Sequence, residues 1–428
     1  MKSINITQLL LISWAGMRGP GSHVALWLFA ILSVVLLAQD GENLLIVTRR
    51  ANNLLAKPLP QVASVALFSF SYVLGMICYG FYDFHLDART IFDLLLLPPV
   101  LFSIGFMLAK RQPSLFFNAL LAFSLAGVLY VSATVISNIL SSPASFQVFP
   151  KEIINIWSGV NVNVRSIEQS AFMGLAISPW LLFGTRLIKP FGPLSLPLIT
   201  WIRAFFVLPF FTTWFLNGRL GWLSLMLSLM VLVLKSSVSM SSALSAARLA
   251  FLGLVGAMGV FLFGYIRHAS SSASDNIWNQ GICDERFDLF LGFLRRIPND
   301  LWGGRQIVVG FQSCEGEPLL LSSGIEATHA SVHNVFFDII FSVGVIPCLF
   351  LLLASYLSLK RFLCSSFEMP AGKWDRLFAL QIVWLCVFLP QFLFQPLHYT
   401  DSILFVIGFL WLGSVCAVDN ARTGDSCS

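Results

Sequence analysis

One histidine and two arginines have the surroundings that chemistry at a membrane surface requires. His333 and Asn334 open an otherwise apolar run that continues to about residue 359. A transmembrane helix begins in this way when its first turn lies in a site at the membrane surface. Gly344 follows His333 by eleven residues, close to three helical turns, so both would share one face of a continuous helix. The pattern predicts an acid–base group above a notch that a neighbouring helix or a lipid tail can approach.

Arg219 and Arg286 are the candidate phosphate ligands. Arg219 follows an Asn-Gly pair and opens an apolar helix, so its guanidinium would lie at headgroup level and could hold a phosphate through two parallel hydrogen bonds. A snorkelling arginine without a ligand is the alternative interpretation. Arg286 stands in the first turn of an expected helix, where the helix dipole disfavours a cation. A bound anion or a salt bridge to the two acidic residues before it would explain that position.

Metal and redox chemistry have weaker sequence support. His329 precedes His333 by four residues, a spacing that can bind zinc on a helix, but no HExxH signature or obvious third ligand accompanies it. We therefore expect no metal site and keep His329 as a minor supporting candidate. Cys283 and Cys314 share the one long polar loop and could form a disulfide if that loop faces an oxidising compartment; the spacing leaves their pairing open.

The composition determines where these residues can lie. The chain is 57% hydrophobic and only 11% charged, against about 25% charged in soluble domains. A chain of this kind must lie almost entirely in lipid, so residues 1–428 are expected to form a single all-α, polytopic membrane domain. No GxGxxG pattern or Walker lysine is present, and neither a nucleotide nor a nucleic-acid partner is expected.

Twelve apolar stretches are predicted to be helices. The first, from Ile4 to about Gly16, is short for a crossing and could instead lie at the interface, which would leave eleven spans. The others run at about 22–38, 61–81, 91–109, 115–138, 169–185, 194–216, 219–234, 249–266, 334–359, 377–396 and 401–417.

The distribution of Lys and Arg orients these spans, because short cytoplasmic loops carry an excess of both. One alternate set of short loops holds thirteen and the opposite set five, so the first set is expected to be cytoplasmic. The long loop 267–333 then faces outward, as do Arg219 and His333, and the tail 418–428 is cytoplasmic. Apolar residues at 287, 290, 291 and 294 predict an amphipathic helix in this loop. A second outward loop, about 141–169, is expected to be a partly ordered cap.

These residues together resemble the O-antigen ligase and O-antigen polymerase superfamily of bacterial membrane glycosyltransferases. The last outer loop of that family ends in His, then Asn, Ser or Gln, then nine residues, then Gly-x-x and Gly, Thr or Tyr. His333-Asn334, nine residues and Gly344-Val-Ile match this pattern, and the final position, a proline, departs from it. Asn-Gly-Arg219-Leu-Gly-Trp is similar to the family's outer-face arginine. Asp-Glu-Arg286-Phe, followed by Asn-Asp-Leu-Trp-Gly-Gly, is similar to its loop arginine and glycine turn. The resemblance covers about residues 193–359.

The resemblance implies a GT-C-like fold and transfer of an undecaprenyl-diphosphate-linked glycan to an acceptor hydroxyl. The active site would face the periplasm from the bacterial inner membrane. Arg219 and Arg286 would bind the diphosphate and stabilise the charge that develops as it leaves. His333 would accept the proton of the acceptor hydroxyl or orient it, with Asn334, Gly344 and His329 in support. Such a reaction inverts the anomeric centre and needs no metal or other cofactor.

Several alternatives stay open at this point. The single long outer loop favours a ligase with a lipid A–core acceptor over a polymerase, whose acceptor is another lipid-linked glycan. A protein-directed oligosaccharide transferase of the superfamily would be expected to have a longer chain. A secondary transporter would need carboxylates near the bilayer midplane, whereas the acidic residues here lie close to span ends. The sequence does not reveal the sugars or the oligomeric state.

Overall fold

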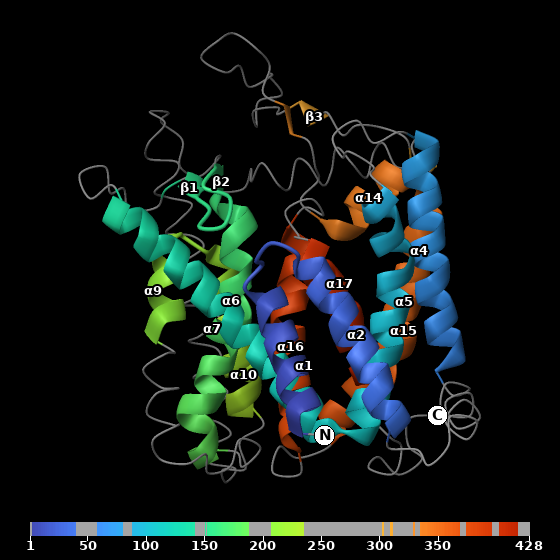
Figure 1. Ribbon diagram of the computed structural model, residues 1–428, viewed down its shortest axis with the longest axis horizontal. Helices are drawn as coiled ribbons and strands as arrows, with labels where there is room; N and C mark the ends of the chain where they lie inside the picture. The colour runs from blue at the N-terminus through green and yellow to red at the C-terminus, as the bar shows by residue number, and fades with distance from the viewer. Residues whose placement is uncertain are drawn as a thin grey trace.

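A computed structural model gives the structure of this chain. It describes residues 2–39, 58–79, 88–141, 150, 152–187, 207–234, 302–303, 309–310, 328–329, 334–368, 374–395 and 402–417. Within them the chain is an all-α bundle with two short strand pairs (Figure 1). The helices are α1 (Lys2–Gly16), α2 (Ser22–Gln39), α4 (Leu59–Tyr79), α5 (Ala88–Arg111), α6 (Pro113–Ser141), α7 (Val164–Leu187), α9 (Val207–Phe215), α10 (Arg219–Leu234), α14 (Val335–Val343), α15 (Val345–Glu368), α16 (Arg376–Phe394) and α17 (Ser402–Cys416).

Four of the described helical segments are long and apolar enough to cross a membrane: Leu59–Cys78, Ile91–Arg111, Pro113–Ser141 and Arg376–Phe394. Shorter apolar helices accompany them, among them Ile4–Gly16. This composition supports a membrane-embedded helical protein, as the sequence predicted. The total of twelve crossings stays a prediction, and the expected helix at 249–266 lies outside the described residues.

Exposed apolar stripes mark the surface that faces lipid. On α2 the side chains of Val24, Leu28, Ile31 and Val35 are all exposed, and their spacing places them on one helical face. In water such a stripe would be an aggregation hazard, whereas in lipid it needs no protein cover. The opposite faces of the helices pack into a core rich in aromatic residues.

Small residues let the helices approach closely. A Cβ at Gly105 of α5 would collide with the carbonyl oxygen of Leu410, and a Cβ at Gly413 of α17 with that of Phe102. Lipid tails are as apolar as the helix surfaces, so association depends on such close van der Waals packing rather than on the hydrophobic effect. Helical serines bond back to their own helix: the hydroxyl of Ser33 donates to the carbonyl of Phe29 (2.7 Å), and that of Ser124 to Leu120 (2.8 Å). No water is available in the bilayer core for these groups.

The predicted continuous helix at 334–359 is wrong in one respect, because it breaks at Gly344. This glycine has φ +101° and ψ 173° and ends α14, and α15 begins at the next residue. Non-glycine residues almost never adopt that conformation. The residues before Gly344 and those after it therefore do not belong to one uninterrupted helix. The break also accounts for Pro347, which is the third residue of α15, where a backbone N–H has no intrahelical acceptor.

The described part of the predicted cap at 141–169 contains an antiparallel strand pair and the start of a helix. Strands β1 (Glu152–Ile154) and β2 (Asn161–Asn163) pair with Ile153 opposite Val162. Helix α7 begins at Val164, five residues earlier than expected. A second pair, β3 (Val309–Gly310) and β4 (Thr328–His329), belongs to the long loop. Figure 1 shows β1, β2, β3 and α14 at the same end of the bundle, the end opposite to the start of α1.

Candidate functional site

Arg219 is the first residue of α10 and follows a tight helix–helix turn. Helix α9 ends in a Schellman motif, in which the amide of Gly218 donates to the carbonyl of Thr213 (2.8 Å) and the amide of Asn217 to that of Trp214 (3.1 Å). Asn217 has φ +56°, a left-handed conformation that asparagine tolerates better than most residues. A cation in the first turn opposes the dipole of α10, so this arginine is placed at a position that helix stability alone would not select.

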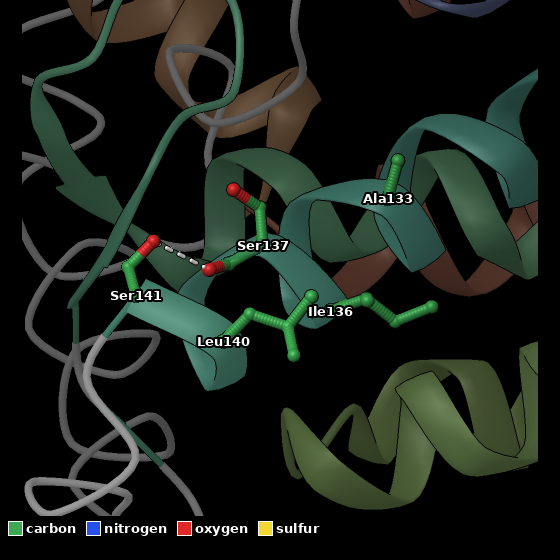
Figure 2. A pocket seen from close by; sticks show the side chains of 5 residues that line it. All are labelled: Ala133, Ile136, Ser137, Leu140 and Ser141. Carbon is green, nitrogen blue, oxygen red and sulfur yellow. Dashed lines mark hydrogen bonds between the residues drawn. The ribbon is translucent and has the colours of Figure 1, made fainter.

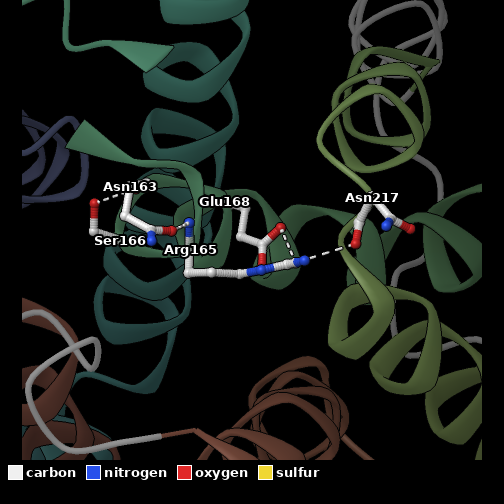
Figure 3. A network of polar contacts seen from close by, with 5 residues as sticks. All are labelled: Asn163, Arg165, Ser166, Glu168 and Asn217. Atoms are coloured by element: carbon white, nitrogen blue, oxygen red, sulfur yellow. Dashed lines mark hydrogen bonds and ion pairs between the residues drawn. The ribbon is translucent and has the colours of Figure 1, made fainter. Parts of the chain in front are cut away.

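The start of α7 holds this turn in place (Figure 3). The side-chain oxygen of Asn163 caps α7 by accepting from the amide of Arg165 (2.9 Å). Nη1 of Arg165 donates to both carboxylate oxygens of Glu168 (2.8 and 3.1 Å) and to the carbonyl oxygen of Asn217 (3.1 Å). Since α7 follows the β1–β2 pair directly, the contact to Asn217 fixes Arg219 at the end of the bundle where the strands lie.

The α1–α2 turn is bound to the same helix start. Nη1 of Arg18 donates to the carbonyl of Ser166 (3.0 Å), and the indole nitrogen of Trp157 donates to the carbonyl of Met17 (2.8 Å). Three connections that are distant in sequence therefore meet at the beginning of α7: the α1–α2 turn, the β1–β2 connection and the α9–α10 turn. The sequence patterns placed both Arg165 and Glu168 in the outward loop 141–169 and did not single out Glu168; only the presence of an acidic residue just before an apolar stretch could have drawn attention to it.

Asn334 is the N-cap of α14. Its Oδ1 accepts from the amides of Phe336 (3.0 Å) and Phe337 (3.1 Å), and its Nδ2 donates to the carbonyl of Leu393 (3.2 Å). One side chain thus starts the helix and ties it to the end of α16.

A junction of three glycines surrounds the helix break. A Cβ on Gly303 would lie 2.5 Å from the backbone nitrogen of Gly344, and a Cβ on Gly75 of α4 would lie 2.7 Å from the Cβ of Val343. Gly303 itself has φ +83°. The Trp302–Gly303 turn of the long loop therefore lies directly on the backbone between α14 and α15. The contact brings residues 302–303 of the long loop beside α14, which the sequence did not predict.

Several sequence-predicted site residues lie outside the described residues, namely His333, Arg286, Cys283 and Cys314. The amphipathic helix at 287–294 lies there too. His329 is in β4, paired with Val309, so it does not form a helical HxxxH pair with His333. No group of three potential metal ligands occurs among the residues that the structure describes.

Helix α16 connects the two parts of the candidate site. Both α10, which begins with Arg219, and α14, which begins after Asn334, pack against α16. On α16, Gln391 is 1% exposed, and neither its amide nitrogen nor its amide oxygen has a hydrogen-bond partner among the residues that the structure describes. A buried amide without partners is unfavourable by about 1–3 kcal/mol, so its presence so near the end of α16 is a feature of the site that pattern reasoning missed.

Two further features lie apart from this site. His23 Nδ1 lies 3.4 Å from Asp93, whose other oxygen accepts from the indole of Trp27 (2.7 Å), so this polar group joins α2 to α5. A pocket of about 560 Å³ on α6 is lined by Ala133, Ile136, Ser137, Leu140 and Ser141 (Figure 2). Its lining comes from one helix and contains no charged side chain, so it lacks the groups that bind a phosphate.

Comparisons with known proteins give no family for this chain. No protein-family model matches it. No protein of curated function matches its sequence. The interpretation of the site therefore depends on its own residues and geometry.

Proposed function

We propose that this chain is a membrane glycosyltransferase that transfers a glycan from a polyprenyl-diphosphate carrier to an acceptor hydroxyl at the outer face of the inner membrane. The observation that carries the proposal is the placement of Arg219. It opens α10 after a turn that is hydrogen-bonded to the start of α7, next to the β1–β2 pair. Figure 1 shows these strands and α14 at the same end of the bundle. In the proposed orientation this end lies at the outer headgroup level, where a lipid diphosphate presents its charge.

The chemistry requires charge stabilisation more than covalent participation. Departure of the diphosphate leaves negative charge on its oxygens, and a guanidinium placed there stabilises the transition state more than the ground state. Arg219 would supply this charge from α10 and Arg286 from the long loop. His333 would receive the acceptor's proton or orient its hydroxyl. Attack from the face opposite the diphosphate inverts the anomeric carbon.

The test is reconstitution of the purified chain in vesicles with a polyprenyl-diphosphate-linked glycan and a lipid A–core acceptor. The wild-type chain is expected to form product without added metal. Arg219→Ala is expected to lower the turnover rate roughly 100-fold, as removal of one charge-stabilising donor does in other enzymes. Arg219→Lys should recover part of it, because a lysine keeps the charge but not the two parallel hydrogen bonds. Arg111→Ala, at the far end of α5, is the matched control. Normal turnover in an Arg219→Ala chain that inserts and folds would refute the proposal.

The acceptor is proposed to be lipid A–core, which makes the enzyme an O-antigen ligase; the polymerase of the same superfamily is the alternative. A lipopolysaccharide gel of a strain lacking the gene distinguishes them. Loss of a ligase removes all O-antigen from the core, whereas loss of a polymerase leaves a single repeat unit attached.

One observation favours a secondary transporter as a second candidate. The α14–α15 break is a discontinuous helix, and Asp338 of α14 is 3% exposed. Transporters build substrate and ion sites from such helices. However, Asp338 lies in the first turn of α14, where the helix N-terminus stabilises a carboxylate without any transported ion. Ion-coupled flux in sealed vesicles that Asp338→Asn abolishes would favour the transporter over the transferase.

A further inference from the structure

Arg165 and Glu168 form an ion pair of unequal exposure at the start of α7. The Glu168 side chain is 1% exposed, whereas that of Arg165 is 37% exposed. A buried carboxylate is strongly unfavourable without a partner, and Arg165 supplies two hydrogen bonds to it from one nitrogen. The buried carboxylate therefore gives the half-exposed guanidinium a fixed partner at the start of α7.

A single oxygen links this pair to Arg219. The carbonyl oxygen of Asn217 accepts from Nη1 of Arg165 (3.1 Å) and from the backbone amide of Arg219 (2.9 Å). Oε2 of Glu168 lies 3.3 Å from the place that a Cβ on Gly218 would take. The pair thus contacts both residues that precede Arg219, and it does so where the chain adopts a left-handed conformation.

We propose that Arg165 and Glu168 are positioning residues that aim Arg219 at the diphosphate of the lipid-linked donor. The inference rests on the proposed function. Because Asn217 has positive φ, its peptide plane sets the direction in which α10 starts. The hydrogen bond from Arg165 holds that plane, and Glu168 holds Arg165. Loss of either partner lets the turn relax and moves the Arg219 guanidinium away from the phosphate oxygens.

Direct binding of the donor by Arg165 is the competing interpretation, and the charges argue against it. Arg165 and Glu168 together are neutral, and a phosphate that reached Arg165 would also approach the buried carboxylate. Like charges at short range repel strongly where water is excluded. All the hydrogen bonds that Arg165 makes from its side chain come from Nη1 and go to the protein. Arg219, which begins α10 beside this pair, is therefore the arginine assigned to the diphosphate in this proposal.

The first experiment measures the turn itself. Glu168→Gln keeps the side-chain shape and removes the charge. Amide hydrogen exchange over residues 214–222 is expected to quicken about tenfold in this variant, since the amides of this turn open more readily when one interaction that holds it is weakened. Glu152→Gln is the matched control, because Glu152 is an exposed carboxylate on β1 at the same end of the bundle. Unchanged exchange in Glu168→Gln would overturn the inference without bearing on the proposed function.

The second experiment measures affinity for polyprenyl diphosphate in detergent micelles, with no acceptor present. Glu168→Gln is expected to weaken binding about tenfold, the change typical of a lost charge-assisted contact. In the Arg219→Ala background the same substitution should have no further effect, because residues that act through one another are not additive. Arg165→Lys keeps Glu168 paired but lacks the planar fork of arginine, so its affinity should lie between those of the wild type and Glu168→Gln.

The possible outcomes separate the explanations. If the double variant loses affinity for the donor by the product of the two single losses, Glu168→Gln and Arg219→Ala act independently, and the positioning role is overturned. Tighter donor binding in Glu168→Gln would also overturn it, because that result means that Arg165 binds the donor once released. A merely structural pair would reduce the amount of folded protein and leave the affinity of the remainder unchanged. A wild-type chain that binds no polyprenyl diphosphate would refute the proposed function, and with it this inference, whatever the exchange rates are.

Discussion

The contact between the long loop and the helix break predicts a specific sensitivity at Gly303. In Gly303→Ala, the added Cβ would lie 2.5 Å from the nitrogen of Gly344 and 2.7 Å from the carbonyl carbon of Val343. Both are backbone atoms, which cannot rotate away as a side chain could. Forced overpacking of this kind destabilises by about 1–3 kcal/mol. The positive φ of Gly303 adds about 1 kcal/mol for any residue with a Cβ.

Gly159→Ala separates the two contributions. Gly159 has φ +66°, similar to the +83° of Gly303, but a Cβ there would meet nothing within 4 Å. Gly159→Ala should therefore show the backbone effect alone, and Gly303→Ala should be about 2 kcal/mol less stable than this control. Thermal denaturation in detergent, followed by tryptophan fluorescence, compares the two. Transfer activity should fall only in Gly303→Ala, because the loop that bears Arg286 is displaced. Equal stability of the two variants would refute the packing of the loop on the break.

Three further predictions concern the helices around the site. Asn334→Ala removes the cap of α14 and should lower the free energy of unfolding by about 1 kcal/mol. Asn334→Asp keeps the capping acceptor and should lower it less. Equal losses in the two variants would mean that the hydrogen bond donated by the amide to Leu393, and not the cap, provides the stability. Gly105→Val should prevent stable insertion, because the valine side chain would collide with the backbone of α17. Gly408→Ala should be expressed and fold normally, because the added Cβ would have its nearest neighbour at 3.7 Å. Gln391→Leu should leave thermal stability unchanged or raise it, because the amide has no hydrogen-bond partner within the described part of the chain. A clear loss would reveal a ligand or an ordered water at that amide.

The sequence determined most of the helical architecture. Spans expected at about 22–38, 61–81, 91–109 and 115–138 correspond to α2, α4, α5 and α6 within a few residues. The reason is physical: a chain in lipid must satisfy its backbone hydrogen bonds within each segment, so a long apolar run has few conformations besides a helix. The start of a helix near Asn334 was also expected, because polar residues open the apolar run there; that Asn334 caps this helix is shown only by the structure.

The break at Gly344 was not visible from hydropathy. The run from Val335 onward is apolar on both sides of the glycine, and a membrane helix tolerates an isolated glycine without breaking. What decides the conformation is the neighbouring backbone: Gly303 lies against the break and Gly75 against the residue before it. Only the folded chain brings these segments together. The proline at position 347, an anomaly in the sequence, then becomes a normal first-turn residue.

The arginines illustrate the same division. Residue type and position relative to the spans were sufficient to select Arg219, since a cation at the start of an apolar helix needs a reason to be there. The sequence could not show that Arg165, more than fifty residues earlier, would share one carbonyl oxygen with the amide of Arg219. Local composition determines which segments enter the membrane and which residues can do chemistry. Tertiary packing determines how those residues are aimed, because a turn with a left-handed residue takes its direction from the partners that hold it.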